Sequence, residues 1–251
     1  MYNEIFDIGF ISIHGYGLMI GIGILCALIT AGKRAKKRGL DADFVYSLGV
    51  VTLIFGFIGA KLLYCVVEIN AFFNEPMRIV SGSGFVVYGG IIGGILAAML
   101  YCRSKRVNFF QYFDLTVPSV ALAQGFGRIG CFLAGCCYGR ETDSAIGIVF
   151  HNSSFAPNGV KLIPTQLFSS AGDFLIAIVL LFYAQKDRRT GKVGSLYLIL
   201  YSVGRFIIEF FRNDYRGSVG ILSTSQLISV IILAIGIVMF SSKELPWANK
   251  E

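Results

Sequence analysis

The sequence predicts an all-α, polytopic membrane protein with about seven transmembrane helices. The chain has 251 residues, of which 55% are hydrophobic and only 15% are charged, whereas roughly 25% of the residues of soluble domains are charged. Apolar runs of about 20 residues, enough to cross a hydrocarbon core of about 30 Å, recur along the whole chain. Because no long polar stretch is left over, we expect a single integral membrane domain over residues 1–251.

Seven apolar segments are expected to span the membrane. The first is too long for the core of a secretory signal and has no basic region before it, so it also qualifies as a span. The second carries Lys61, the fourth Arg128, the fifth Asp173, and the sixth Arg205 and Glu209. Glycine residues interrupt the first, third and fourth apolar segments. The segments cover residues of about 8–31, 44–68, 84–102, 112–135, 164–185, 194–212 and 221–241.

Basic clusters alternate between these segments and predict the orientation of the chain. The stretches GKRAKKRG, RSKR and KDRRTGK follow the first, third and fifth segments, and Lys243 and Lys250 follow the seventh. Short loops that are rich in Lys and Arg stay in the cytoplasm. We therefore expect the N-terminus outside and the C-terminus in the cytoplasm, with the other loops facing outward.

The composition argues against nucleic-acid binding and against a disulfide scaffold. The net charge is +7, but no soluble module presents a basic and aromatic face. Cysteines 26, 65 and 102 fall in or beside apolar runs, where a thiol behaves as a small hydrophobe. Cysteines 131, 136 and 137 cluster, and a metal site or a disulfide is an alternative to simple packing there. Structural zinc sites usually bring four ligands, so we favour packing and expect no metal and no cofactor.

Ionisable residues at membrane depth give the strongest functional signal. A charge there costs on the order of 3 kcal/mol on insertion scales and is by default a functional hypothesis. Arg205 and Glu209 are four residues apart, so a structural ion pair is the simplest explanation of both. It leaves Lys61 and Arg128 as excess positive charge. The anion that a bilayer supplies in quantity is a lipid phosphate, which arginine binds through two parallel hydrogen bonds, so we expect a phospholipid site.

Six ordered motifs carry a resemblance to one family. The stretch GRIGCFLAGCCYG, from Gly127, resembles the signature of the prolipoprotein diacylglyceryl transferase family, G-R-I-G-N-F-x-N-G-x-x-x-G. The match runs from about Ile13 to Asp214. In family order, HGYGLMI resembles R-W-Y-G-L-M, GAKLLYCV resembles G-A-R-L-x-Y, VYGGIIGG resembles F-H-G-G-x-x-G, IPTQLF resembles H-P-S-Q-L-Y, and GRFIIEFFRND resembles R-F-x-x-E-F-F-R.

The resemblance implies a multi-pass enzyme of the bacterial cytoplasmic (inner) membrane, surrounded by membrane lipids. Such an enzyme moves the diacylglyceryl group of phosphatidylglycerol onto the thiol of a lipobox cysteine in a prolipoprotein signal peptide, and releases glycerol phosphate. By position, Arg128 and Arg205 would bind the lipid phosphate, Glu209 would orient Arg205, and Tyr88 is the fourth candidate catalytic residue. The candidates for substrate binding are Tyr16, which would line the head-group cavity, Lys61, Gly89, Gly90, Cys131, Gly139, Gln166 and Arg212.

Two positions depart from the family pattern. Tyr88 stands where the third-span motif has histidine, and Cys131 stands where the signature has asparagine. With an unperturbed pKa of about 10, Tyr88 is a poor base at neutral pH unless neighbouring cations stabilise its phenolate. Neither His14, expected at an interface, nor His151, expected in an outward loop, occupies that position. The alternatives are a diverged relative that uses the phospholipid cavity on another acceptor, and a lipid-binding membrane protein without catalysis.

Overall fold

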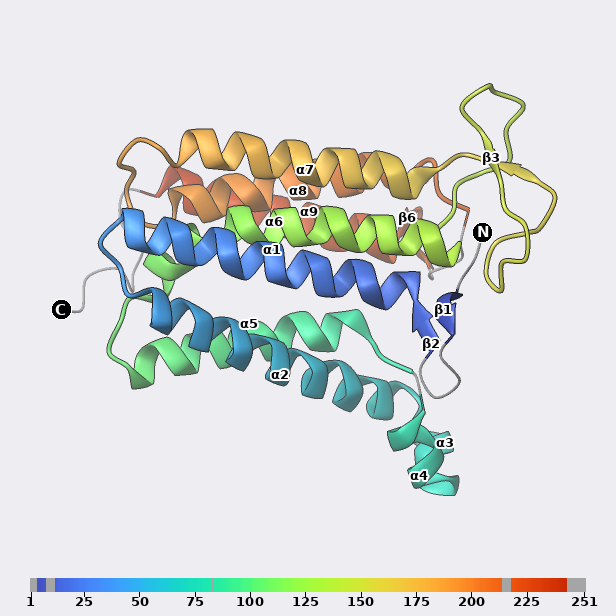
Figure 1. The fold of residues 1–251 in the computed structure, drawn as a ribbon, viewed down its shortest axis with the longest axis horizontal. Helices are drawn as coiled ribbons and strands as arrows, with labels where there is room; N and C mark the ends of the chain where they lie inside the picture. The colour runs from blue at the N-terminus through green and yellow to red at the C-terminus, as the bar shows by residue number, and fades with distance from the viewer. Residues whose placement is uncertain (1–3, 8–11, 83, 214–217, 243–251) are drawn as a thin grey trace. The chain divides into compact units, whose positions relative to one another are not determined.

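The computed structural model describes residues 4–7, 12–82, 84–213 and 218–242. The all-α class is confirmed, since long helices make up most of these residues and the strands are short (Figure 1). The elements in chain order are β1 Glu4–Asp7, β2 Ser12–His14, α1 Gly15–Lys37, α2 Ala42–Val67, α3 Ile69–Asn74, α4 Pro76–Ser81, α5 Val87–Ser104, α6 Phe109–Ala134, β3 Ile148–Val149, β4 Lys161–Leu162, α7 Thr165–Tyr183, α8 Lys192–Glu209, β5 Ser218–Val219, β6 Leu222–Ser223 and α9 Thr224–Ser241.

The described residues form two compact units. One unit combines the chain before residue 32 with the chain after residue 112, and the other consists of Gly32–Tyr112. We call them the large unit and the small unit, and describe each by itself.

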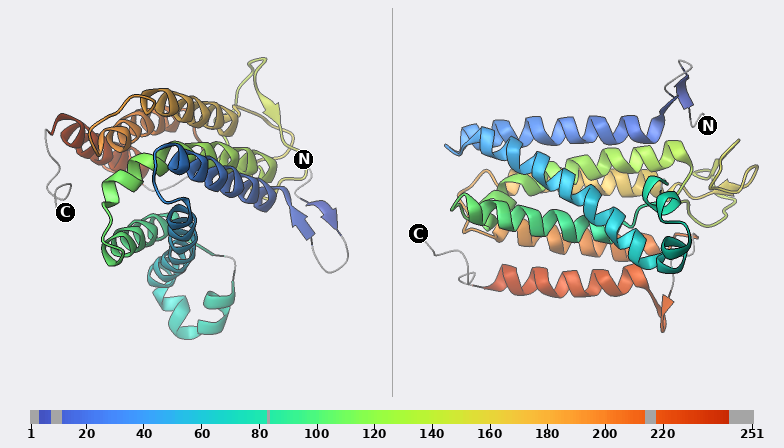
Figure 2. Two further views of the ribbon diagram at one scale, coloured as in Figure 1. Left: turned by 60° about the vertical axis from the view of Figure 1, so that its left-hand side comes forward. Right: turned by 90° about the horizontal axis from the view of Figure 1, so that it is seen from below.

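In the large unit, α7 packs on α8 and α8 packs on α9, with α6 and most of α1 beside them (Figures 1 and 2). Small residues let α1 and α6 approach closely, because a Cβ on Gly23 would lie 3.0 Å from the carbonyl oxygen of Ala123. The Thr30 hydroxyl also donates to Ser119 Oγ across 2.9 Å. The apolar core is centred on Val117, Ala121, Ala177, Leu180, Ala184, Val193 and Tyr197.

A buried carboxylate fixes the turn between α7 and α8. Asp114 on α6 accepts hydrogen bonds from the backbone N–H groups of Gly191 and Gly194, each at 2.6 Å. Gly191 has a φ of 90°, which glycine adopts without strain. Because the first N–H groups of a helix lack intrahelical acceptors and attract negative charge, Asp114 defines where α8 begins.

Short strands and loops gather at the opposite end of the large unit (Figure 1). Antiparallel pairs join β1 to β2, β3 to β4 and β5 to β6. The β1–β2 pair ends at His14, so α1 begins at Gly15, later than the expected start of the first span; residues 8–11 lie outside the described residues. The loop between α6 and α7 is at this same end, as is the start of α9.

The small unit is a helix pair held by glycine. Helix α2 packs along α5 (Figure 2). A Cβ on Gly59 would overlap the carbonyl oxygen of Gly89, and one on Gly93 would lie 2.6 Å from the carbonyl oxygen of Phe55. Only glycine allows the two backbones this close, so the glycines of α5 serve helix packing.

Six of the described helices are long and apolar enough to cross a membrane: α1, α2, α5, α6, α7 and α9. Helix α8 lies in the sixth expected segment but is not among these six. Its 18 residues include Lys192, Arg205 and Glu209. These three charged residues lower the mean hydropathy of the helix.

Candidate functional site

Arg128 lies one turn after a close contact between α6 and α7. One turn earlier, the ring of Phe174 lies so near Gly125 that a Cβ there would come within 2.5 Å of it. The Ser170 hydroxyl donates to the carbonyl of Gly125 at 2.9 Å. This contact brings Nε of Arg128 to 4.0 Å from Oδ2 of the buried Asp173.

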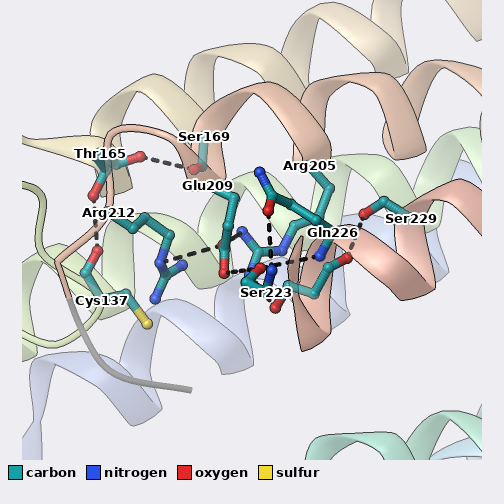
Figure 3. A network of polar contacts seen from close by, with 10 residues as sticks. Cys137, Thr165, Ser169, Arg205, Glu209, Arg212, Ser223, Gln226 and Ser229 are labelled. Carbon is teal, nitrogen blue, oxygen red and sulfur yellow. Dashed lines mark hydrogen bonds and ion pairs between the residues drawn. The ribbon is translucent and has the colours of Figure 1, made fainter. Parts of the chain in front are cut away.

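The end of α8 carries a buried ion cluster (Figure 3). Nη1 of Arg205 lies 2.6 Å from Oε2 of Glu209, and Nε of Arg212 lies 3.9 Å from the same oxygen. The other carboxylate oxygen, Oε1, accepts from the Ser223 hydroxyl at 2.9 Å, and Nη2 of Arg205 donates to Ser225 Oγ at 2.8 Å. Both side chains of the Arg205–Glu209 pair are almost fully buried.

The start of α9 positions the two serines. Ser223 and Gln226 form a capping box, in which the Ser223 hydroxyl accepts from the backbone N–H of Gln226 at 3.2 Å. The Gln226 side chain accepts from the backbone N–H of Ser223 at 3.0 Å. A capping box supplies acceptors for backbone N–H groups that have no intrahelical partner at the start of a helix. Here it also fixes the hydroxyl that donates to Glu209.

Arg128 and Arg205 line one cavity of about 220 Å³ between α6, α7 and α8. Asp173 and Tyr201 complete its polar wall. Arg128, Arg205 and Arg212 face the two carboxylates Asp173 and Glu209, so the site retains one positive charge in excess. The remaining wall consists of Phe168, Ser169, Gly172, Ile176, Gly204, Ile207 and Ile208.

The backbone just after α6 is hydrogen-bonded to residues just before α7 and just after α8. Gly139 pairs with Arg212 as an isolated antiparallel bridge, and its N–H donates to the carbonyl of Ile163 at 3.0 Å. A Cβ on Gly139 would lie 2.6 Å from that carbonyl oxygen. The buried Gln166 donates to the carbonyl of Cys136, and the Thr165 hydroxyl donates to that of Cys137, both at 2.8 Å. Gly139 therefore fixes the backbone beside Arg212, and Gln166 fixes the backbone at Cys136.

Three thiols meet at the end of α6. The helix closes with a Schellman motif, in which Gly135, at φ 75°, donates to Phe132 O and Cys136 N–H donates to Cys131 O, both at 3.1 Å. This turn folds Cys136 back over Cys131, and the sulfur atoms of Cys131, Cys136 and Cys137 all lie within 4.8 Å of one another. Hydrogen bonds with the neighbouring thiols, together with burial, raise the pKa of Cys136.

Tyr16, at the start of α1, lies beside this cluster. A Cβ on Gly130 would come within 3.1 Å of the Tyr16 carbonyl and 3.2 Å of its ring. Tyr16 also interacts electrostatically with the three cysteines and with Arg128. The first turn of α1 therefore lies against the signature segment of α6.

The other predicted site residues belong to the small unit. Tyr88 lies in the first turn of α5 and is 41% exposed. Gly89 and Gly90 face the backbone of α2. The Lys61 ammonium donates to the carbonyls of Gly82, at 2.6 Å, and Gly84, at 3.2 Å. These carbonyls give a structural reason for a lysine at position 61, since cations stabilise helix C-termini such as that of α4.

Sequence reasoning missed two parts of the site and assigned a third part, the thiol cluster, to simple packing. Asp173 stands out as an acid in an apolar segment, but its pairing with Arg128 depends on how α6 and α7 cross. Ser223 and Ser225 contact the ion cluster from a different helix, and nothing in a single sequence links them to α8. The thiol cluster had a readable signal, because Gly135 marks a helix end that brings Cys131 and Cys136 together.

Comparison with known proteins identifies the family of this chain. The model of the prolipoprotein diacylglyceryl transferase family matches residues 3–242. The phosphatidylglycerol–prolipoprotein diacylglyceryl transferase of Clostridium tetani is 51% identical over 242 residues, which cover 96% of this chain and 97% of the relative.

Two further relatives agree. Phosphatidylglycerol–prolipoprotein diacylglyceryl transferase 2 of Clostridium perfringens is 49% identical, over 97% of this chain and 94% of its own. The enzyme of that name from Finegoldia magna is 33% identical, over 93% and 92%. Because the family model covers almost the whole sequence and these relatives align end to end with it, the chain belongs to the prolipoprotein diacylglyceryl transferase family.

Proposed function

We propose that this protein transfers the diacylglyceryl group of phosphatidylglycerol to the thiol of a lipobox cysteine in a prolipoprotein and releases glycerol phosphate. The observation that carries the proposal is the cavity shared by Arg128 and Arg205. Its single excess positive charge matches the single negative charge of a phosphodiester. The names of the relatives support the same donor and acceptor.

The arginines act on the leaving group. The acceptor sulfur attacks the glyceryl carbon, and the bond between that carbon and the phosphate oxygen breaks. The phosphodiester then becomes a monoester, whose charge approaches two negative units at neutral pH. Arg128 and Arg205 therefore bind the departing group more strongly than the intact lipid, and such differential binding lowers the barrier.

The remaining site residues support these two. Glu209 holds Arg205 by the 2.6 Å ion pair, and Arg212 shares the same carboxylate. Gly139 and Gln166 hold the backbone that follows α6, and Tyr16 of α1 lies against Gly130, next to Cys131 near the end of α6. Tyr88 is proposed as the fourth catalytic residue, and Lys61, Gly89 and Gly90 are proposed to serve substrate binding.

We propose that the site end of the large unit faces outward from the bacterial cytoplasmic membrane. The α7–α8 turn carries Lys186, Arg188 and Arg189, and such clusters stay in the cytoplasm. Arg205 lies about 20 Å from Lys192 along α8. The N-terminus then lies outside, and residues 1–251 are proposed to form a single membrane domain with seven spans.

A reconstituted assay tests the function. The purified protein is incubated with phosphatidylglycerol vesicles and a lipobox peptide, and both the thioether-linked diacylglyceryl peptide and glycerol phosphate are quantified. We expect equal amounts of the two products, and none with a peptide carrying serine in place of cysteine. Arg78→Ala, which removes an exposed arginine of α4, is the matched control and should retain activity. Release of glycerol phosphate without peptide modification, or neither product, would contradict the proposal.

A further inference from the structure

We propose that Cys131, Cys136 and Cys137 form a zinc site with three thiolate ligands, whose fourth position takes up the thiol of the acceptor cysteine. The second half of this inference rests on the proposed function, and the first half does not. It replaces the packing role that the sequence favoured, because the structure brings together sulfurs that the sequence only places near one another.

The distances fit a tetrahedral metal. Zinc binds cysteine sulfur at about 2.3 Å, so two sulfurs on one tetrahedral zinc lie about 3.8 Å apart. The three sulfur atoms of the cluster already lie within 4.8 Å of one another. Side-chain adjustments of about 1 Å would close the site, with no change in the course of the backbone.

The backbone of the cluster is fixed in advance. The Schellman motif holds Cys136 over Cys131, and the carbonyls of Cys136 and Cys137 accept hydrogen bonds from Gln166 and Thr165. Cys137 has a φ of 63°, which side chains other than glycine rarely adopt. Strained backbone of this kind clusters at functional sites, and here it turns the third thiol toward the other two.

The number of ligands points to a reactive site. Within the part of the chain that the structure describes, no histidine, aspartate or glutamate joins the three cysteines. Structural zinc sites are closed by four protein ligands, whereas catalytic sites have three and keep one position open. Arg128 lies one turn before Cys131 on the same face of α6, so the cluster lies beside an arginine that lines the cavity.

The open coordination position would activate the acceptor thiol. Transfer requires a thiolate nucleophile, and no histidine is present among the described residues that line the cavity. A thiol that coordinates a metal is deprotonated. At the fourth position the acceptor thiol would lose its proton to solvent. Its sulfur then forms the bond to the glyceryl carbon, and the phosphate leaves with the electron pair of the broken C–O bond. The thioether product is neutral and is therefore a weaker ligand, which favours its release.

Metal binding is measured first. The protein is purified under reducing conditions in detergent, and zinc is quantified by mass spectrometry. After replacement of zinc by cobalt(II), the absorption spectrum is recorded, because tetrahedral thiolate ligation gives intense visible bands and sulfur-to-cobalt charge transfer. We expect about one metal ion per chain.

Matched cysteine variants test the ligand set. Cys131→Ser, Cys136→Ser and Cys137→Ser should each lower metal affinity at least about tenfold. Cys26→Ser and Cys65→Ser, which change half-buried cysteines in other helices, should leave it unchanged. The proposal would be overturned if the wild-type protein bound no metal, or if the cluster variants and the control variants lowered metal affinity equally. It would also be overturned if thiol alkylation of the protein directly in cells revealed a disulfide within the cluster.

The fourth position is tested by adding the lipobox peptide to the cobalt-loaded protein. The cysteine peptide should shift the charge-transfer bands toward those of four thiolates, and the serine peptide should not. In the transfer assay, the rate of metal-free protein should fall about tenfold per pH unit below the thiol pKa, while that of the zinc-loaded protein should fall less. Full transfer by metal-free protein at every pH would overturn this inference and leave the proposed function intact. Loss of transfer by zinc-loaded protein that still shows the spectral shift would count against the proposed function alone.

Discussion

Arg205 and Glu209 face each other one turn apart on α8, with Nη1 and Oε2 separated by 2.6 Å and both side chains almost fully buried. Arg205 reaches the cavity as well, whereas Glu209 does not line it. The carboxylate therefore positions the guanidinium that faces the substrate.

Arg205→Ala removes a phosphate contact and leaves Glu209 with a more distant partner. We expect diacylglyceryl transfer to fall by about 10²- to 10³-fold, the usual loss when one donor to a developing charge is removed. The thioether assay measures the rate. Thermal unfolding in detergent provides the control, since breaking a buried pair also destabilises, by about 3 to 5 kcal/mol. Transfer within twofold of wild type would exclude Arg205 from the site.

Glu209→Gln tests whether the negative charge of Glu209 is needed to position Arg205, because it removes the charge and keeps the shape of the side chain. Glutamine keeps a carbonyl oxygen for the Ser223 hydroxyl but loses the charge that Arg205 and Arg212 share. We expect the turnover number to fall about tenfold or more while the lipid remains bound, since the added positive charge favours an anion. Separate measurement of lipid binding and turnover checks this. Loss of lipid binding together with unchanged turnover would contradict it.

Arg128→Lys keeps the positive charge but replaces the planar guanidinium group, with its parallel N–H donors, by an ammonium group. Because lysine cannot make two parallel hydrogen bonds to one phosphate, we expect transfer to drop about tenfold to a hundredfold. Asp173→Asn is the informative companion, because it removes the carboxylate 4.0 Å from Arg128 while preserving shape. Full activity of Arg128→Lys would show that point charge alone is enough at this position.

Tyr88 decides how closely this chain follows the chemistry of its family. If the hydroxyl orients the lipid or assists deprotonation of the thiol, Tyr88→Phe should lower turnover by about one to four powers of ten, the upper range being typical of lost general-base help. Tyr88→His is compared in the same assay. Unchanged activity of the phenylalanine variant would reject a chemical role, and a gain with histidine would indicate that this position still accepts a base.

The orientation is tested with reporter fusions. Reporters near Lys37, Arg106 and Arg189 should report a cytoplasmic location, because their loops carry the basic clusters. Reporters near Asn74 and Asn158 should report the outer side. A cytoplasmic reporter at Asn158, in the loop between α6 and α7, would reverse the face on which the site opens.

The sequence predicted the helical class because apolar length and charge are local properties of the chain. It also indicated Arg128 and Arg205, since each is costly at membrane depth. Asp173, Ser223 and Ser225 could not be assigned in this way, because their roles come from contacts between helices. The short strands were missed for a related reason. Pairs such as Ile148–Val149 with Lys161–Leu162 are too brief to leave an alternating pattern.

Helix α8 has a consequence for how the protein is made. If α8 entered the bilayer alone, Arg205 and Glu209 would have only each other as partners, and an isolated charge at membrane depth costs on the order of 3 kcal/mol. Their partners Ser223 and Ser225 lie at the start of α9, which is synthesised later and is strongly apolar. Stable integration of α8 therefore depends on the helix that follows it. A nascent chain that stops before α9 would expose α8 as an incompletely inserted segment, open to quality-control proteolysis.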